Sequence, residues 1–140
     1  MKLAFAATTA LLLTACSGGL SGGLKVVESD LQHHHWNLTA IDGVAVNADI
    51  KSDLEIGEHF SINGRAGCNR FFGSATLTQG LLKAEPLATT RMACAPAEQK
   101  VESAVLDTLN NGAVVSQNGQ LLELKGDPHT LTYQLADWVQ

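Results

Sequence analysis

The sequence predicts an α+β domain: a small barrel-like, mostly antiparallel β-sheet with one amphipathic helix packed against it. Three observations lead to this prediction. Short segments alternate apolar and polar residues, turn residues separate these segments, and one long mid-chain segment has helical spacing. About seven short strands favour a curled sheet or barrel over a flat sheet, because closure removes exposed edges.

The N-terminus has the pattern of a secretory signal peptide, which we expect to span residues 1–15. Lys2 provides a single positive charge, and the uncharged segment 3–15 that follows is mostly Leu, Ala, Phe and Thr. This segment is too short to cross a bilayer as a helix, which needs about 20 apolar residues. It is therefore expected to direct export and then be removed.

A lipobox-like motif, Leu13-Thr14-Ala15-Cys16, directly follows the apolar segment. Small residues let a peptidase approach the backbone, and the thiol of Cys16 is the expected lipidation site. A diacyl anchor there would hold the chain on a membrane. Ser17 stands where lipoproteins retained at the inner membrane often have Asp, so we expect lipid anchoring at the outer membrane, facing the periplasm.

Residues 16–30 are expected to be the lipidated cysteine and a flexible linker, and residues 31–140 the folded domain. The segment 17–23 is SGGLSGG, which has no apolar period, and the folded body is expected to begin near His34. Loss of Lys2 leaves eight basic side chains against fourteen acidic ones. No basic cluster is present, which argues against nucleic acid as a partner.

Cys68 and Cys94 remain after Cys16 is assigned to lipid. An even pair in an oxidising compartment predicts one disulfide, and a bridge across about 26 residues would stabilise the fold by roughly 3.5 kcal/mol. Two alternatives stay open. The cysteines could be free buried thiols, or Cys94, near Arg91 and a helix N-terminus, could be a reactive thiolate or a metal ligand.

The elements follow in chain order. Residues 35–41 alternate Trp36, Leu38 and Ala40 on one face, and the later segments show similar alternation between turn signals. Asp42-Gly43, Gln79-Gly80 and Asn118-Gly119 are the strongest turn signals. The further strands are expected at 54–56 and 60–62 (a hairpin around Gly57-Glu58), 71–78, 81–84, 113–115, 120–124 and 130–135.

One helix is predicted from Pro96 to about residue 109. Proline suits a first helical turn, and Gly112 is placed to cap the last one. The apolar face is expected to contain Ala97, Val101, Ala104, Val105, Thr108 and Leu109, and the polar face Glu98, Gln99, Glu102, Ser103 and Asp107. The helix should therefore lie with one face on the sheet.

Three stretches then resemble one family. They are Trp36-Asn37-Leu38 with Gly43, the segment 64–73 with sequence GRAGCNRFFG, and the segment 88–94 with sequence ATTRMAC. Together they resemble the META domain family, in particular its HslJ-like heat-shock envelope lipoproteins, over residues 31–138. The resemblance implies a barrel-like fold, a link to envelope stress, no catalytic activity and no cofactor. The residues that carry the family motif are Trp36, Gly67, Asn69, Arg70, Gly73, Thr90 and Arg91.

Several motif residues have structural interpretations. Asn69 is expected to hydrogen-bond its own turn. Gly64, Gly67 and Gly73 are expected to form tight turns and a bulge next to a disulfide, since the Gly-Lys-Ser/Thr ending of a phosphate loop is missing. If the two cysteines pair, Arg70 and Arg91 should come near one another. Their guanidinium groups are then expected to satisfy carbonyls or a carboxylate, with an anion site as the alternative.

Metal and enzyme sites are not favoured by the sequence. His33 and His35 would share a face of an extended chain, but two ligands without a third make a weak metal site. No nucleophile elbow is present, and the carboxylates Asp30, Asp42, Glu85 and Asp137 are scattered along the chain.

The function predicted from the sequence is that of a lipid-anchored, non-enzymatic envelope domain. It would support heat or envelope-stress tolerance by binding another envelope component, as a monomer. Its partners would be the membrane, through the lipid, and an envelope protein. The alternatives are a carrier or sensor of a small apolar ligand inside the barrel, or an inhibitor or accessory factor of an envelope enzyme.

Overall fold

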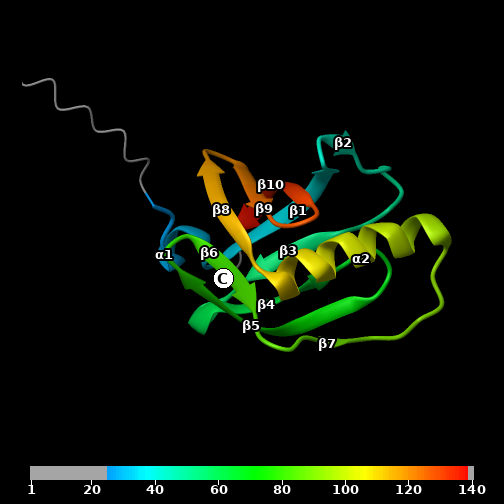
Figure 1. Ribbon diagram of the computed structural model, residues 1–140, viewed down its shortest axis with the longest axis horizontal. Helices are drawn as coiled ribbons and strands as arrows, with labels where there is room; N and C mark the ends of the chain where they lie inside the picture. The colour runs from blue at the N-terminus through cyan, green and yellow to red at the C-terminus, as the bar shows by residue number, and fades with distance from the viewer. Residues whose placement is uncertain (1–24, 139–140) are drawn as a thin grey trace, which may run out of the picture.

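The computed structural model of the chain describes residues 25–138 (Figure 1). The predicted signal peptide and the lipidation site Cys16 lie outside the described residues. The described chain is a β-barrel with one long helix against it, as the sequence predicts.

Eight antiparallel strands close the barrel in the order β1-β3-β4-β5-β6-β8-β9-β10, and β10 pairs with β1 to complete the ring. Two short strands, β2 and β7, lie off the ring on β1 and β5. The strands are β1 (His34–Ile41), β2 (Val44–Ala45), β3 (Asp53–Ile56), β4 (Ser61–Arg65), β5 (Arg70–Thr78), β6 (Leu81–Ala84), β7 (Ala88–Thr89), β8 (Ala113–Asn118), β9 (Leu121–Lys125) and β10 (Thr130–Trp138).

The turns agree closely with the sequence signals at two of three places. Asp42-Gly43 and Gln79-Gly80 each have positive φ at both positions, the backbone geometry that a two-residue hairpin favours. At the third place the loop is Gly119-Gln120, one residue later than the predicted Asn118-Gly119, because Asn118 still pairs with Leu121.

Two short helical segments were not predicted. Helix α1 (Glu28–Leu31) begins inside the segment expected to be linker, and its Leu31 is fully buried in the core. The segment η1 (Glu58–Phe60) is a 3₁₀ turn that joins β3 to β4, so Phe60 is buried from a turn and not from a strand.

Helix α2 (Pro96–Asn111) crosses one end of the barrel (Figure 1). Its first turns pack on Gly67, in the turn between β4 and β5, and Thr108 near its end lies beside Gly126, between β9 and β10. The C-terminus is capped by Gly112, whose φ is 95° and whose N–H donates to the Thr108 carbonyl.

The predicted apolar face of α2 is correct except at one end. Val101, Ala104, Val105, Thr108 and Leu109 are buried, but Ala97 is exposed because the first turn projects beyond the sheet.

The barrel interior is filled by large side chains. The largest of those that are almost completely buried are Trp36, Tyr133, Phe60, Phe71, Leu31, Leu54, Ile56, Ile62, Leu82, Leu109, Leu122 and Leu124. They come from α1, α2, η1 and seven of the barrel strands, so one continuous core holds the fold together.

Candidate functional site

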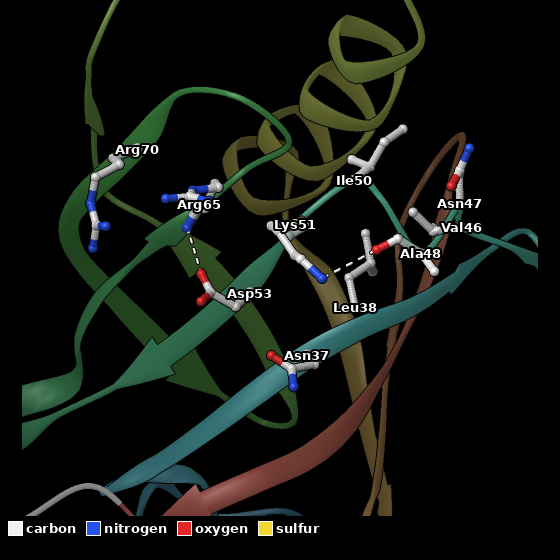
Figure 2. Close-up of a pocket in the computed structure, with 11 residues that line it drawn as sticks. Asn37, Leu38, Val46, Asn47, Ala48, Ile50, Lys51, Asp53, Arg65 and Arg70 are labelled. Carbon is white, nitrogen blue, oxygen red and sulfur yellow. Dashed lines mark hydrogen bonds between the residues drawn. The ribbon is translucent and has the colours of Figure 1, made fainter.

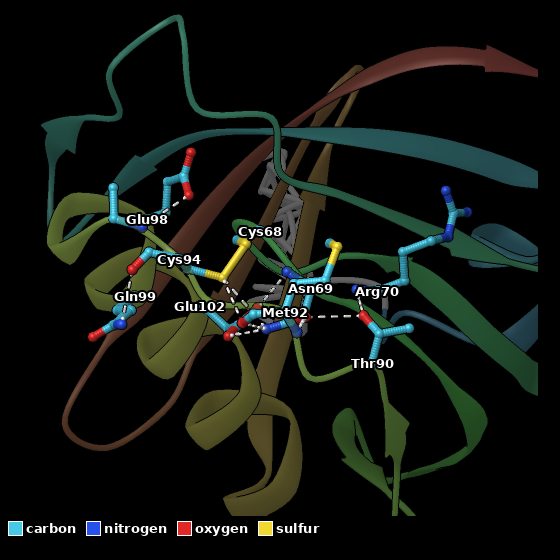
Figure 3. Close-up of a disulfide and its surroundings, with 10 residues drawn as sticks. Cys68, Asn69, Arg70, Thr90, Met92, Cys94, Glu98, Gln99 and Glu102 are labelled. Carbon is cyan, nitrogen blue, oxygen red and sulfur yellow. Dashed lines mark hydrogen bonds between the residues drawn. A yellow bond between two sulfur atoms is a disulfide. The ribbon is translucent and has the colours of Figure 1, made fainter.

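The two cysteines are joined in a disulfide at the point where α2 meets the barrel (Figure 3). Their Cα atoms lie 6.0 Å apart, within the range that a bridge requires. Cys68 lies two residues before β5 begins, and Cys94 two residues before α2 begins. Because the sulfurs are bonded to each other, Cys94 is not a thiolate nucleophile in this state.

Asn69 connects three segments beside this disulfide. Its Oδ1 accepts hydrogen bonds from the Met92 N–H at 2.6 Å and from the Thr90 hydroxyl at 3.0 Å. Its Nδ2 donates to Glu102 Oε2 at 3.1 Å, and its backbone N–H donates to Glu102 Oε1 at 2.6 Å. The prediction that this side chain bonds its own turn is therefore wrong, since its partners lie in other segments.

We call this arrangement the junction: the disulfide Cys68–Cys94 together with Asn69, Thr90 and Glu102. Asn69 is only 7% exposed, so each of its polar atoms needs a protein partner, and each has one. Glu102, which the helical pattern assigns to the polar face of α2, is half-buried because it supplies those partners.

The motif glycines allow close approach of the backbone. A Cβ on Gly67 would lie 2.6 Å from the Glu98 carbonyl oxygen and 2.9 Å from the Glu102 nitrogen, so a larger residue would push α2 away. A Cβ on Gly73 would meet Leu87 at 2.9 Å. Neither residue, nor Gly64, has positive φ. Gly67 lies in the turn between β4 and β5, as the sequence predicts, whereas Gly64 and Gly73 lie within β4 and β5, so the turn prediction is wrong for those two.

The remaining motif residues divide between core and surface. Trp36 is fully buried and its ring meets that of His34 edge-on, with centroids 5.7 Å apart. Arg70 and Arg91 are exposed, and within residues 25–138 neither guanidinium makes a hydrogen bond or a salt bridge. The expectation that both arginines satisfy carbonyls or a carboxylate is thus not met.

A groove with a volume of about 390 Å³ lies on the outer surface next to the junction (Figure 2). The loop from residue 46 to residue 52 forms one wall, and β3, β4 and β5 form the other. Its lining consists of Asn37, Leu38, Val46, Asn47, Ala48, Ile50, Lys51, Ser52, Asp53, Arg65 and Arg70. We call it the basic groove, because three of its residues are cations and only Asp53 is an acid.

Hydrogen bonds hold the loop of the basic groove in place. The Leu38 N–H donates to the Ser52 carbonyl and the Val46 N–H to the Thr39 carbonyl. The buried Ser52 hydroxyl donates to the Ala66 carbonyl at 2.9 Å, which ties the loop to the turn that also contains the disulfide. The groove is therefore a formed feature of the fold.

The histidine cluster does not form the arrangement that an extended chain would give. His33 has φ 63°, so it turns away from the strand that begins at His34. His35 Nε2 lies 2.9 Å from Asp53 Oδ2. Among the described residues, the one grouping of three potential metal ligands is Cys68, Cys94 and Glu98, and its two sulfurs are already bonded to each other.

A histidine–carboxylate pair lies near the first half of α2. His129 Nδ1 is 2.7 Å from Asp42 Oδ2, and the Thr130 N–H donates to Asp42 Oδ1. These two hydrogen bonds, the one from Thr130 first, hold the pKa of Asp42 below its usual value. Ser103 lines a surface hollow with His129, but no hydrogen bond joins them. The pair therefore lacks the bonded nucleophile of a triad, and it ties the β1–β2 turn to β10.

Comparison with known proteins agrees with this architecture. A family model described as the META domain matches residues 29–138. The chain is 35% identical over 138 residues to "Heat shock protein HslJ" of Escherichia coli strain K12, covering 97% of this chain and 96% of that protein.

Two solved structures, both determined by NMR, have the same fold. The first superposes with a TM-score of 0.72 at 38% identity and covers 80% of this chain and 97% of that one. The second, from Burkholderia xenovorans, gives a TM-score of 0.64 at 30% identity and covers 78% of this chain and 86% of that one. The family match, the relative and the shared fold agree: the chain belongs to the META domain family and is HslJ-like.

Proposed function

We propose that this chain is a lipid-anchored, non-enzymatic domain of the cell envelope, sorted to the outer membrane and facing the periplasm. In this proposal it supports tolerance of heat or envelope stress by binding another envelope component on its surface. The heat-shock name of its relative and the lipobox-like sequence at Cys16 support the setting. No helix among residues 25–138 is long and apolar enough to cross a membrane.

The observation that carries the binding role is the contrast between a filled interior and a formed groove outside. Large side chains that are almost completely buried occupy the core, whereas the basic groove is open to solvent and lined largely by polar and charged groups. Such a surface suits a partner that approaches from outside.

A carrier role is the second candidate, because two polar atoms inside the barrel have no hydrogen-bond partner among residues 25–138. They are Trp36 Nε1 and the Tyr133 hydroxyl, and burial raises the pKa of Tyr133. A small ligand with an acceptor atom would satisfy them. Binding of the solvatochromic probe Nile red separates the two roles. A carrier would bind the probe inside the barrel, and Tyr133→Phe would change that binding.

The proposed setting is tested by expressing the full chain in a Gram-negative strain that lacks the gene. The wild type should incorporate labelled palmitate, fractionate with the outer membrane and restore survival after a temperature upshift. Cys16→Ser should lose all three properties. Equal palmitate labelling of both proteins, or full heat survival with the unlipidated chain, would contradict the anchor or its importance.

Ser17→Asp provides the matched control, because it should keep the lipid and change only the sorting. We expect this variant to incorporate palmitate but to fractionate with the inner membrane. If it protects cells as well as the wild type does, outer-membrane placement is not needed for the function.

A further inference from the structure

The three cations of the basic groove are gathered in a chain that is otherwise acidic. The whole sequence has a formal net charge of −5, yet Lys51, Arg65 and Arg70 line a single groove together with one carboxylate. Figure 2 shows both arginines on the strand side and Lys51 near the middle, toward the loop wall. This grouping makes the groove a place on the described surface that can receive an anion, although Lys51 and Arg65 also line a neighbouring hollow with Asp49 and Glu98.

Arg65 and Arg70 are direct cross-strand partners in the pairing of β4 with β5. Like charges at directly opposed positions destabilise a sheet. Both side chains are exposed, and within residues 25–138 neither guanidinium has a hydrogen bond or an ion pair. The arrangement therefore costs stability in the free protein, and a bound anion would relieve that cost.

The groove's own acid does not neutralise these arginines by contact. Asp53 Oδ1 accepts a hydrogen bond from the backbone N–H of Arg65 at 2.6 Å, and Oδ2 is bonded to His35. The two oxygens of Asp53 therefore link β3 to β4 and to β1. The Lys51 ammonium donates to the Ala48 carbonyl at 3.2 Å, which leaves its charge without an acidic partner.

The rest of the lining is suited to a peptide. Leu38, Val46 and Ile50 give the groove an aliphatic side, and the amides of Asn37 and Asn47 can donate or accept hydrogen bonds. A free phosphate would use the cations but not the aliphatic groups.

The groove lies away from the point where the described chain enters the barrel. The chain enters the barrel at His34, which pairs with Ile56 at the end of β3. Arg65 and Arg70 lie at the opposite end of the β4–β5 pair, beside the junction.

We propose that the basic groove binds carboxylates of an extended acidic peptide segment, with apolar neighbours of those carboxylates resting on its aliphatic side. The guanidinium groups would bind carboxylate oxygens in the two-point geometry that arginine favours, and Lys51 would add a point charge. This inference rests on the proposed function and deepens it. It names an acidic peptide segment as the feature by which the groove would recognise the envelope component.

The test uses the lipid-free mature chain and a fluorescein-labelled peptide with two adjacent glutamates next to a leucine, in low salt. We expect saturable binding that weakens as salt is added and that is absent for the peptide with glutamines in place of the glutamates. The variant Arg65→Gln/Arg70→Gln should weaken binding by about tenfold or more. Amide shifts in NMR spectra should cluster at residues 37–38, 46–53 and 65–72.

The matched control is Lys100→Gln/Lys125→Gln, which removes the same charge from residues outside the groove. When measured in about 0.1 M salt, it should bind the peptide within about twofold of the wild type, because charges more than about 10 Å apart are then largely screened. If both double variants weaken peptide binding equally, the effect comes from net charge alone and the proposal is wrong. Peptide binding that survives Arg65→Gln/Arg70→Gln would also overturn the proposal.

Two competitor probes distinguish the source of the anion. Inorganic phosphate, and vesicles of phosphatidylglycerol with phosphatidylethanolamine, should compete only weakly. Tight binding of either one with no binding of the peptide would overturn the peptide assignment in favour of a phosphate ligand or a lipid surface.

Failure here is distinguishable from failure of the proposed function. If the peptide does not bind but the anchored wild type still protects heated cells, this inference is wrong and the proposed function stands. If the peptide binds as described but Cys16→Ser protects fully, the groove assignment stands and the anchored role is wrong.

Discussion

The junction and the basic groove meet at the consecutive residues Asn69 and Arg70, but the polar side chains of these two residues are in opposite environments. Asn69 points inward, is buried, and has every polar side-chain atom bonded. Arg70 points outward, away from the disulfide in Figure 3, and its guanidinium has no partner among the described residues. Asn69 lies in the turn just before β5 and Arg70 is the first residue of that strand, so neighbouring motif residues face opposite ways where the turn meets the strand.

This difference separates residues that hold the fold from residues that remain open to a ligand. In the junction, hydrogen bonds and the disulfide connect α2 to the barrel, so changes there should cost stability. In the basic groove the charges repel one another, so their removal should cost no stability and should affect binding alone. The following predictions test this division, beginning with the largest effect.

Loss of the disulfide should have the largest effect on stability. Cys68→Ser/Cys94→Ser releases a closure across a sequence separation of 26 residues. The chain-entropy model gives a loss of roughly 3.5 kcal/mol in the free energy of unfolding. Chemical denaturation of oxidised wild type, reduced wild type and the double variant measures it. If the reduced wild type is as stable as the oxidised protein, the disulfide does not contribute to the stability that we assign to the junction.

Asn69→Ala should destabilise the protein by roughly 2 to 4 kcal/mol. It removes the hydrogen bonds to Thr90, Met92 and Glu102 and leaves a half-buried carboxylate short of donors. The control is Asn63→Ala on β4, whose side chain makes no hydrogen bond within the described part of the chain. Equal melting temperatures for the two variants would show that the junction is no more important to the fold than an ordinary surface site.

Gly67→Ala should cost about 2 kcal/mol, as overpacking does at a tight contact. The added methyl group meets backbone atoms of α2 at 2.6 and 2.9 Å, and backbone cannot move aside as a side chain can. Gly57→Ala is the comparison, since its closest contact at 2.8 Å is the Ser61 side-chain hydroxyl. A smaller loss is expected there, and thermal unfolding of both variants decides the order.

Arg65→Gln/Arg70→Gln should leave the free energy of unfolding unchanged or raise it by up to about 0.5 kcal/mol. The reason is relief of a like-charge cross-strand pair at the surface. The gain should shrink in high salt, which screens the repulsion. Destabilisation by more than about 1 kcal/mol would mean that these arginines support the fold, and the contrast with the junction would fail.

The sequence predicted the barrel well because alternation reports burial directly. Trp36, Leu38, Leu54 and Ile56 all turn inward as the pattern requires. Strands β2 and β7 were missed because two residues carry no period. The burial of two α2 residues departs from the helical pattern. Ala97, in the first turn, projects past the sheet and is exposed, and Glu102 is half-buried because it bonds Asn69.

The candidate site was harder to predict because its parts come from distant segments. Arg70 was recognised as a motif residue, but its groove also needs Lys51 and the loop that carries it, and that loop has no distinctive pattern. The hydrogen bonds of Asn69 reach Glu102, 33 residues away, a separation that local turn chemistry does not register. The residue types were visible in the sequence, whereas their partners were set by tertiary structure.

The pairing of β1 with β10 has a consequence for how the chain reaches its folded state. Thr39, which bonds the Thr132 carbonyl across this seam, does so over a separation of 93 residues. Contacts so distant in sequence slow folding, because most of the chain must be ordered before they form. Until the last strand arrives, β1 and β9 both present open edges that can pair with other chains. Assembly of the barrel is thus most vulnerable to aggregation just before its final strand is added.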